Sequence, residues 1–203
     1  MESIEESYHS KYGAIQESRH VFIEAGLRYV KKRLDRSIGI LEIGFGTGLN
    51  TFLTAAEDDR DIFYTAIDPY PVPKSIYSGL NYPEKSALDP SLFESLHEAP
   101  WEKKVSITPS FTLFKTTQSF FEIPLTEPID LIYFDAFSPT TQPELWTTRV
   151  FKRLHECLSS TGVLVSYCCK GSVKDALRDA GFSVTRLQGP KGKRHMSRAE
   201  KGA

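Results

Sequence analysis

The chain has few of the residues that mark secreted or membrane-spanning proteins. Its 203 residues contain three cysteines, and Cys157, Cys168 and Cys169 are too few and too closely spaced for a disulfide framework. No run of 18 or more apolar residues is present, so no transmembrane helix is expected. The first six residues, Met1–Glu6, are acidic where a secretory signal would be basic and then apolar. We therefore expect a cytoplasmic protein without membrane contact.

Two common kinds of catalytic or metal site are also missing from the sequence. His9 and His20 do not have the spacing of metal ligands, and the adjacent Cys168 and Cys169 lack further Cys or His at ligand spacing. Neither a Gly-x-Ser-x-Gly motif nor a Ser-His-Asp arrangement is found, which argues against a hydrolase. We expect no metal ion in the site.

The composition is that of an ordinary globular protein, with 40% hydrophobic residues, 25% charged residues and a formal net charge of −1. This length suits one hydrophobic core, so we expect one domain over residues 1–203, with an N-terminal helical extension over 1–37. The charge is segregated, because the chain from Arg186 onward has six basic residues and one acidic residue. The preceding part has 19 basic and 25 acidic residues. This asymmetry predicts either a local anion-binding surface or a solvated tail.

Short apolar runs alternate with segments of helical periodicity along the chain. Strands are predicted at 38–43, 62–67, 129–134, 162–167 and 182–187, with one or two more within 105–115. Helices are predicted at 16–34, 49–56, 92–96, 143–158 and 173–180. Strands that are apolar throughout and alternate with helices predict an α/β fold, with a parallel sheet covered by helices on both faces. Ligands of such folds bind beyond the carboxyl ends of the strands.

The first candidate site is the segment LEIGFGTGLN at 41–50, in which a predicted strand runs into three glycines and then into a helix. Glycines allow a sharp turn and a close approach of a ligand to the backbone. The Gly-x-Gly-x-Gly spacing differs from that of a dinucleotide site and suits a ligand without a pyrophosphate. Glu42, two residues before the first glycine, could accept hydrogen bonds from a cationic amino group. The pattern favours a cofactor loop over a mere tight turn.

Two aspartates end predicted strands. Asp68 follows the strand at 62–67 and could accept both hydroxyls of a ribose, or it could be a turn residue before Pro69. With the glycine loop upstream, we favour the ribose contact. Asp135 follows a buried strand, where a carboxylate is costly to hide, so it should face a cleft or a partner. It is either a cofactor or substrate contact or a cap of the turn at 138–139, and the pattern does not choose between them.

Several segments together resemble the MnmC-like methyltransferase family. They are ESRHVFI (17–23), LEIGFGTGLN (41–50), DAFSP (135–139), QPELW (142–146) and GPKGKR (189–194). The similarity extends from about Tyr8 to about Met196. It implies a class I S-adenosylmethionine-dependent methyltransferase with a Rossmann-like sheet of seven strands. Helices would cover both faces, and the last strand, near 193–198, would be antiparallel.

The implied reaction is methylation of the 5-aminomethyl group on the wobble uridine or 2-thiouridine of tRNA, in the anticodon region. The product would be 5-methylaminomethyl(-2-thio)uridine. In bifunctional relatives, a flavin-dependent oxidoreductase domain removes a carboxymethyl group before methylation. This chain has no second glycine fingerprint, so we expect it to perform only the methylation.

The resemblance also assigns roles to individual residues. Asp135 would be catalytic, as a carboxylate that attracts the cationic amine and accepts its proton. The cofactor would be bound by Glu42, Gly44, Phe45, Gly46, Gly48, Asn50, Asp68 and Thr117. The substrate would be bound by Phe137, Pro139, Lys193 and Arg194, the two basic residues through tRNA phosphates. The sequence departs from the family pattern at Thr117, where an acid usually contacts the adenine, and at His195, where the family has glutamate.

Two other functions stay open at this stage. The modest basic tail is compatible with a class I methyltransferase or aminopropyltransferase that acts on a small amine. The departures at Thr117 and His195 are compatible with a tRNA- or protein-binding relative without catalysis, although the intact Glu42, Asp68 and Asp135 argue against it. The sequence makes no prediction of the oligomeric state.

Overall fold

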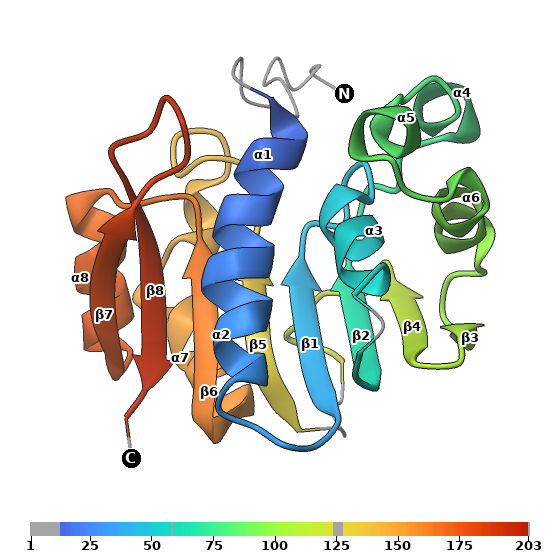
Figure 1. The fold of residues 1–203 in the computed structure, drawn as a ribbon. Coiled ribbons are helices and arrows are strands. Elements are labelled where there is room, and N and C mark those ends of the chain that lie inside the picture. The colour runs from blue at the N-terminus through green and yellow to red at the C-terminus, as the bar shows by residue number, and fades with distance from the viewer. Residues whose placement is uncertain (1–12, 58, 124–127, 203) are drawn as a thin grey trace.

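The computed structural model describes residues 13–57, 59–123 and 128–202. They form one eight-stranded sheet in the order β3-β4-β2-β1-β5-β6-β8-β7, with helices on both faces (Figure 1). The predicted α/β architecture is confirmed. Residues 1–12 of the predicted N-terminal extension, including Tyr8, lie outside the described residues.

Five strands at the centre of the sheet are parallel to one another. They are β4 (Phe111–Thr116), β2 (Ile62–Ile67), β1 (Ile38–Ile43), β5 (Ile129–Phe134) and β6 (Leu158–Ser166). The bounds of β1, β2 and β5 are those predicted from the apolar runs. Every residue of β1 and β5 is buried, because helices cover both faces of the sheet there.

The remaining strands are antiparallel to their neighbours. β8 (His195–Lys201) lies between β6 and β7 (Phe182–Gln188) and is antiparallel to both, which confirms the antiparallel last strand. β3 (Lys104–Thr108) pairs with β4 as an antiparallel hairpin. The sheet therefore has eight strands where seven were expected, because the polar β3 adds to the edge beside β4.

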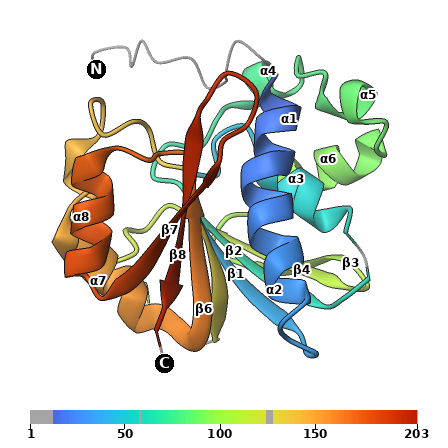
Figure 2. The same ribbon diagram turned by 60° about the vertical axis from the view of Figure 1, so that its left-hand side comes forward.

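One face of the sheet is covered by a long N-terminal helix and by the helices that follow the glycine loop (Figure 2). The long helix consists of α1 (Ala14–Ser18), the π-helical η1 (Arg19–Leu27) and α2 (Arg28–Lys31). In η1 the backbone N–H of Arg28 reaches back five residues to the Ile23 carbonyl. The other helices of this face are α3 (Leu49–Ala55), α4 (Lys74–Tyr77), α5 (Tyr82–Ser86) and α6 (Pro90–Glu98).

The opposite face is covered by α7 (Thr148–Cys157) and α8 (Gly171–Asp179) (Figure 2). The helix predicted from residue 143 begins later, because Pro143–Leu145 form the 3₁₀ turn η2 and Thr147 caps α7 by accepting the N–H of Val150. Among the described residues, no helix combines the length and the apolar character that a membrane span requires.

The carboxyl ends of the central strands meet at one edge of the sheet. The N–H of Gly44 donates to the Ile67 carbonyl at 2.9 Å, and the N–H of Asp135 donates to the Ile43 carbonyl at 3.1 Å. The N–H of Asp68 donates to the Thr116 carbonyl at 3.0 Å. These bonds hold the loops after β1, β2 and β5 side by side, where a ligand of a parallel sheet is expected.

Candidate functional site

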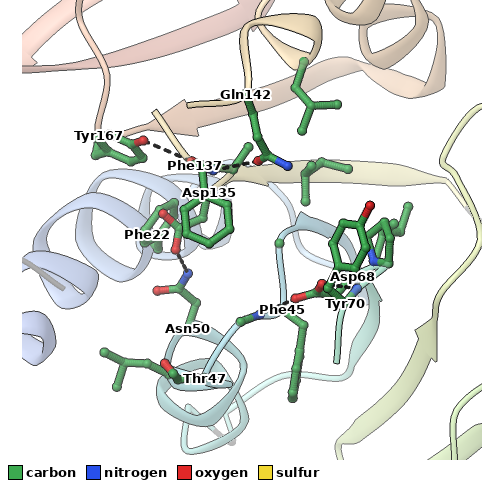
Figure 3. A pocket seen from close by; sticks show the side chains of 18 of the residues that line it. Phe22, Phe45, Thr47, Asn50, Asp68, Tyr70, Asp135, Phe137, Gln142 and Tyr167 are labelled. Carbon is green, nitrogen blue, oxygen red and sulfur yellow. Dashed lines mark hydrogen bonds between the residues drawn. The ribbon is translucent and has the colours of Figure 1, made fainter. Parts of the chain in front are cut away.

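A cavity of about 510 Å³ lies at this edge of the sheet, a volume typical of small-molecule sites (Figure 3). Its walls come from the glycine loop, from the residues after β2, β4, β5 and β6, from the loop between β7 and β8, and from the N-terminal helix. The polar side chains that line it include Glu17, Ser18, Asn50, Asp68, Asp135, Gln142, Tyr167 and Lys193. The apolar walls include Phe22, Ile43, Leu49, Ile67, Phe120, Ala136 and Leu145.

The glycine loop needs its glycines for both conformation and space. Gly44, Gly46 and Gly48 all have positive φ, of 93°, 51° and 73°. A Cβ on Gly44 would lie 2.8 Å from the Asp135 carbonyl oxygen, and one on Gly48 would lie 2.8 Å from His97 Nε2. Gly44, Phe45 and Gly46 line the cavity, whereas Gly48 shapes the entry into α3 from behind the wall.

Asp68 lines the cavity at the end of β2 and is held by two backbone donors (Figure 3). Its Oδ2 accepts the N–H of Gly46 at 2.7 Å, and its Oδ1 accepts the N–H of Tyr70 at 2.9 Å. The bond from Tyr70 is the turn contact that the sequence left as an alternative. The same carboxylate also faces the cavity, so the two interpretations of Asp68 are compatible. The ribose contact stays a prediction.

Asn50 joins two carboxyl groups at the centre of the site. Its Nδ2 donates to Asp135 Oδ2 at 2.8 Å and to Glu42 Oε1 at 3.0 Å. Its Oδ1 accepts the Ser18 hydroxyl, which comes from α1. The side chain of Asn50 is therefore fixed on both sides, with its amide facing the catalytic candidate Asp135 (Figure 3).

Glu42 is fully buried and does not belong to the cavity wall. Its carboxyl group accepts hydrogen bonds from Asn50 and from the Thr51 hydroxyl, the latter at 2.8 Å. Burial raises the pKa of Glu42 to about 8, so the carboxyl group is largely neutral at pH 7. The structure therefore gives Glu42 a position one side chain behind the cavity, where it orients Asn50, and a direct cofactor contact through Glu42 stays a prediction.

Asp135 lies at the cavity wall at the carboxyl end of β5. Burial raises the pKa of Asp135 to about 7, while the hydrogen bond from Asn50 opposes that rise. Glu17 raises the pKa of Asp135 further, and the charge of Lys193 lowers it. A carboxylate with a pKa near neutrality can accept a proton and release it again at physiological pH, which is what a general base requires.

Thr117 does not face the cavity. It follows β4 as an exposed residue, and both its N–H and its hydroxyl donate to Glu102 Oε1, at 2.8 and 3.3 Å. The wall at this place is formed instead by Ser119, Phe120 and Phe121. The structure therefore does not support the expected cofactor contact of Thr117, because the chain turns outward directly after the strand.

The predicted substrate-binding residues lie in different places. Phe137 lines the cavity, whereas Pro139 lies outside its wall. Arg194 is exposed on the loop between β7 and β8. Lys193 instead turns into the cavity, where its ammonium donates to Glu17 Oε1 and lies 4.4 Å from the centroid of the Tyr167 ring. The basic tail is thus not one continuous surface, and Arg198 at its far end stacks on Tyr29.

Sequence reasoning missed several residues of the cavity. Glu17, Ser18 and Phe22 come from the N-terminal helix, and their only signal was the ESRHVFI segment shared with the family. Gln142 lies within the QPELW segment, and its Oε1 accepts the N–H of Phe137 at 3.1 Å. Tyr167 carried no signal, because it is the last residue of the strand predicted at 162–167 and belongs to none of the segments shared with the family. Among the described residues, no group of three or more His, Cys, Asp or Glu could hold a metal ion.

Comparisons with known proteins agree with this architecture. Residues 112–202 match a family described as S-adenosyl-L-methionine-dependent methyltransferase. The chain is 26% identical, over 95% of its length, to the tRNA 5-methylaminomethyl-2-thiouridine biosynthesis bifunctional protein MnmC of Marinomonas sp.. It is 30% identical, over 94% of its length, to the protein of the same name from Ralstonia nicotianae. It spans 31% of the length of each of these relatives.

Among solved structures, the chain is similar to MNMC2 from Aquifex aeolicus, with a TM-score of 0.72 and 24% identity. The match covers 97% of this chain and 64% of that one, and it shows a shared fold. The family match also confirms the prediction that the cofactor is S-adenosylmethionine. Together, these similarities confirm the resemblance to the MnmC-like methyltransferase family and the class I S-adenosylmethionine-dependent methyltransferase fold.

Proposed function

We propose that this chain transfers a methyl group from S-adenosylmethionine to the 5-aminomethyl group of the wobble uridine or 2-thiouridine in tRNA. The observation that carries the proposal is the position of Asp135, a carboxyl group with a pKa of about 7 on the wall of the cofactor-sized cavity. The relatives named for 5-methylaminomethyl-2-thiouridine biosynthesis support it. The chain spans 31% of the length of these relatives, and the proposal concerns the methylation step only.

The residues of the cavity fit the cofactor. Gly44, Phe45 and Gly46 line the cavity, so a ligand can lie against the backbone of the glycine loop. Asp68 supplies a carboxylate for the ribose hydroxyls, and Ile67 and Phe120 supply apolar walls for a base. When bound, S-adenosylmethionine supplies an electrophilic methyl group that passes to the amine nitrogen while the sulfonium sulfur keeps the bonding electron pair.

Asp135 prepares the amine for this transfer. An alkylamine is largely protonated at neutral pH, and only its neutral form has a lone pair for attack. The carboxylate attracts the ammonium, accepts one of its protons and later releases that proton to water. Such general-base assistance contributes on the order of 100- to 10,000-fold to the rate. Asn50 holds the carboxylate in place through its hydrogen bond of 2.8 Å.

The tRNA would contact the exposed loop between β7 and β8, through Lys191 and Arg194. This loop is next to the cavity, because Lys193 between these two residues lines the wall. The anticodon region is then the part of the tRNA that reaches the site. The proposed substrate agrees with the cytoplasmic location expected from the sequence.

The test is methyl transfer from labelled S-adenosylmethionine to tRNA isolated from cells that lack the final methyl mark, followed by mass spectrometry of the wobble nucleosides. We expect conversion of the aminomethyl nucleoside to its methylaminomethyl form. Asp135→Asn should lower the rate at least about 100-fold while S-adenosylhomocysteine binding stays within a few-fold of wild type.

The same assay separates the alternatives. Methylation of small polyamines in place of tRNA would assign the chain to the small-amine enzymes. If neither S-adenosylmethionine nor S-adenosylhomocysteine raised the melting temperature, the chain would be a binding protein without this catalysis.

A further inference from the structure

The ammonium group of Lys193 is a positive charge within the cavity. The ammonium of Lys193 donates to Glu17 Oε1 and lies 4.4 Å from the centroid of the Tyr167 ring. Glu17 comes from α1, Tyr167 directly follows β6, and Lys193 lies in the loop between β7 and β8. All three line the cavity together with Asp135. The Glu17 side chain is only 16% exposed, so its charge is largely withdrawn from water.

A carboxylate and an aromatic face together make a site for an ammonium ion. The negative face of a tyrosine ring attracts a cation within about 6 Å, and the attraction grows when the pair is withdrawn from water. The carboxylate adds a charge-assisted hydrogen bond, which is stronger than a neutral one. Primary ammonium groups have the right chemistry for both contacts.

The charges that line the cavity also favour a cation beside Glu17. Glu17 raises the pKa of Asp135 and Lys193 lowers it, so the three groups interact electrostatically. Without Lys193, the carboxyl groups of Glu17 and Asp135 would share one cavity wall with no positive side chain between them to offset their repulsion. A substrate that brings its own ammonium would supply the same positive charge.

We propose that Glu17 and the ring of Tyr167 form a subsite for the protonated aminomethyl group of the substrate, and that Lys193 occupies this subsite in the free protein. The inference rests on the function proposed above. The incoming ammonium displaces the ammonium of Lys193. The displaced Lys193 side chain then faces the RNA phosphates, beside the exposed Arg194 of the same loop. Glu17 thereby delivers the amine beside Asp135, the group that takes its proton.

The direct test uses 5-aminomethyluridine nucleoside as the probe and 5-methyluridine as its uncharged match, each titrated into protein saturated with S-adenosylhomocysteine. We expect Lys193→Met to bind the aminomethyl nucleoside several-fold more tightly than wild type, because the competing ammonium is gone. Glu17→Gln should bind it about tenfold more weakly. Neither variant should change the affinity for 5-methyluridine.

Kinetics on tRNA provide a second readout. Glu17→Gln should raise KM for aminomethyl-tRNA about tenfold, whereas Glu24→Gln, an exposed residue on the same long helix, should not. Tyr167→Phe keeps the ring and should keep most of the affinity, whereas Tyr167→Leu should lose it. These substitutions keep the inference testable if one variant fails to fold.

The outcomes separate this inference from the proposed function. If wild-type protein does not methylate aminomethyl-tRNA, the proposed function is wrong. If it does, but Lys193→Met weakens binding of the aminomethyl nucleoside or Glu17→Gln behaves like Glu24→Gln, the cation subsite alone is wrong. A several-fold gain for Lys193→Met together with a loss for Glu17→Gln supports it.

Discussion

The side-chain amide of Asn50 lies 2.8 Å from Asp135 Oδ2 and donates a hydrogen bond to it. This contact joins the first turn of α3 to the loop after β5 and ties the cofactor loop to the catalytic candidate. Because the bond favours the ionised carboxylate, it lowers the pKa of Asp135 against the larger, opposite effect of burial. The strength of the proposed general base therefore depends on Asn50.

Replacement of Asn50 should move the pH dependence of methylation. In wild type, kcat/KM should rise with pH through about 7, as Asp135 loses its proton. Asn50→Leu removes the donor, so the pKa of Asp135 rises and the same limb moves to higher pH. At pH 7 we expect a rate reduction of about 10- to 100-fold. A pH–rate profile measures this, with the exposed Asn81→Ala as the control. An unshifted limb in Asn50→Leu would show that Asp135 is not the titrating group.

A side chain at Gly44 of the glycine loop should weaken cofactor binding. Gly44 has a φ of 93°, and a Cβ there would lie 2.8 Å from the Asp135 carbonyl oxygen. We expect Gly44→Ala to weaken S-adenosylhomocysteine binding at least about tenfold in isothermal titration calorimetry. Gly171→Ala, at the start of α8 with no atom within 4 Å of the added Cβ, is the matched control and should bind normally. Equal affinities for the two variants would contradict this account of the loop.

The buried Glu42 should make the protein less stable at alkaline pH. Its pKa rises from 4.5 in the unfolded chain to about 8 in the folded protein, so the folded state holds a proton that the unfolded state has released. The stabilisation is complete below about pH 4.5 and disappears as the pH rises through 8. We expect Glu42→Gln to remove about 2–4 kcal/mol of the difference in unfolding free energy between pH 5 and pH 9.

Urea denaturation at the two pH values measures this difference. Asp135 contributes a second, smaller decrease of stability between about pH 4 and pH 7, so Asp135→Asn should also flatten the pH dependence. If Glu42→Gln kept the wild-type pH dependence, the carboxyl group of Glu42 would be ionised in the folded protein.

The exposed loop between β7 and β8 should contribute to the salt dependence of tRNA binding. Removal of one ionic interaction with a phosphate should reduce the slope of log K against log salt by about 0.7–0.9. We expect Lys191→Ala with Arg194→Ala to weaken binding and to flatten this slope, measured by filter binding over a salt series. Arg178→Ala on α8, which disrupts only a surface pair with Asp175, is the control. An unchanged slope in the double variant would place the tRNA elsewhere.

The local features of the fold were predictable from the sequence. The apolar runs at 38–43, 62–67 and 129–134 are β1, β2 and β5 with the predicted bounds, because each run ends at a glycine or an aspartate, residues that are infrequent in strands. The conformation of the glycine loop was predictable for the same reason, since only glycine adopts positive φ at no cost. By contrast, β3 is polar and short, and its place at the sheet edge depends on pairing with β4.

The direction in which a side chain points was not predictable. Glu42 turns into the core and Thr117 turns to solvent, although both were expected to bind the cofactor. The side of the sheet on which a residue lies depends on strand register, and a shift of one residue reverses it. The sequence motif therefore located the site, but it did not show which of its residues line the cavity and which lie behind them.

The sequence by itself determined strands β1, β2 and β5, the glycine turn and the aspartates at the strand ends, because these depend on neighbouring residues and on backbone sterics. Only the tertiary structure brought Glu17 to Lys193, two residues separated by 176 positions, and both to the wall that holds Asp135. Such contacts depend on how α1 packs across the sheet and on where the β7–β8 loop ends, and no local pattern encodes them. The local sequence thus determines the glycine loop, whereas the tertiary fold determines the arrangement of the charges of Glu17 and Lys193 beside Asp135.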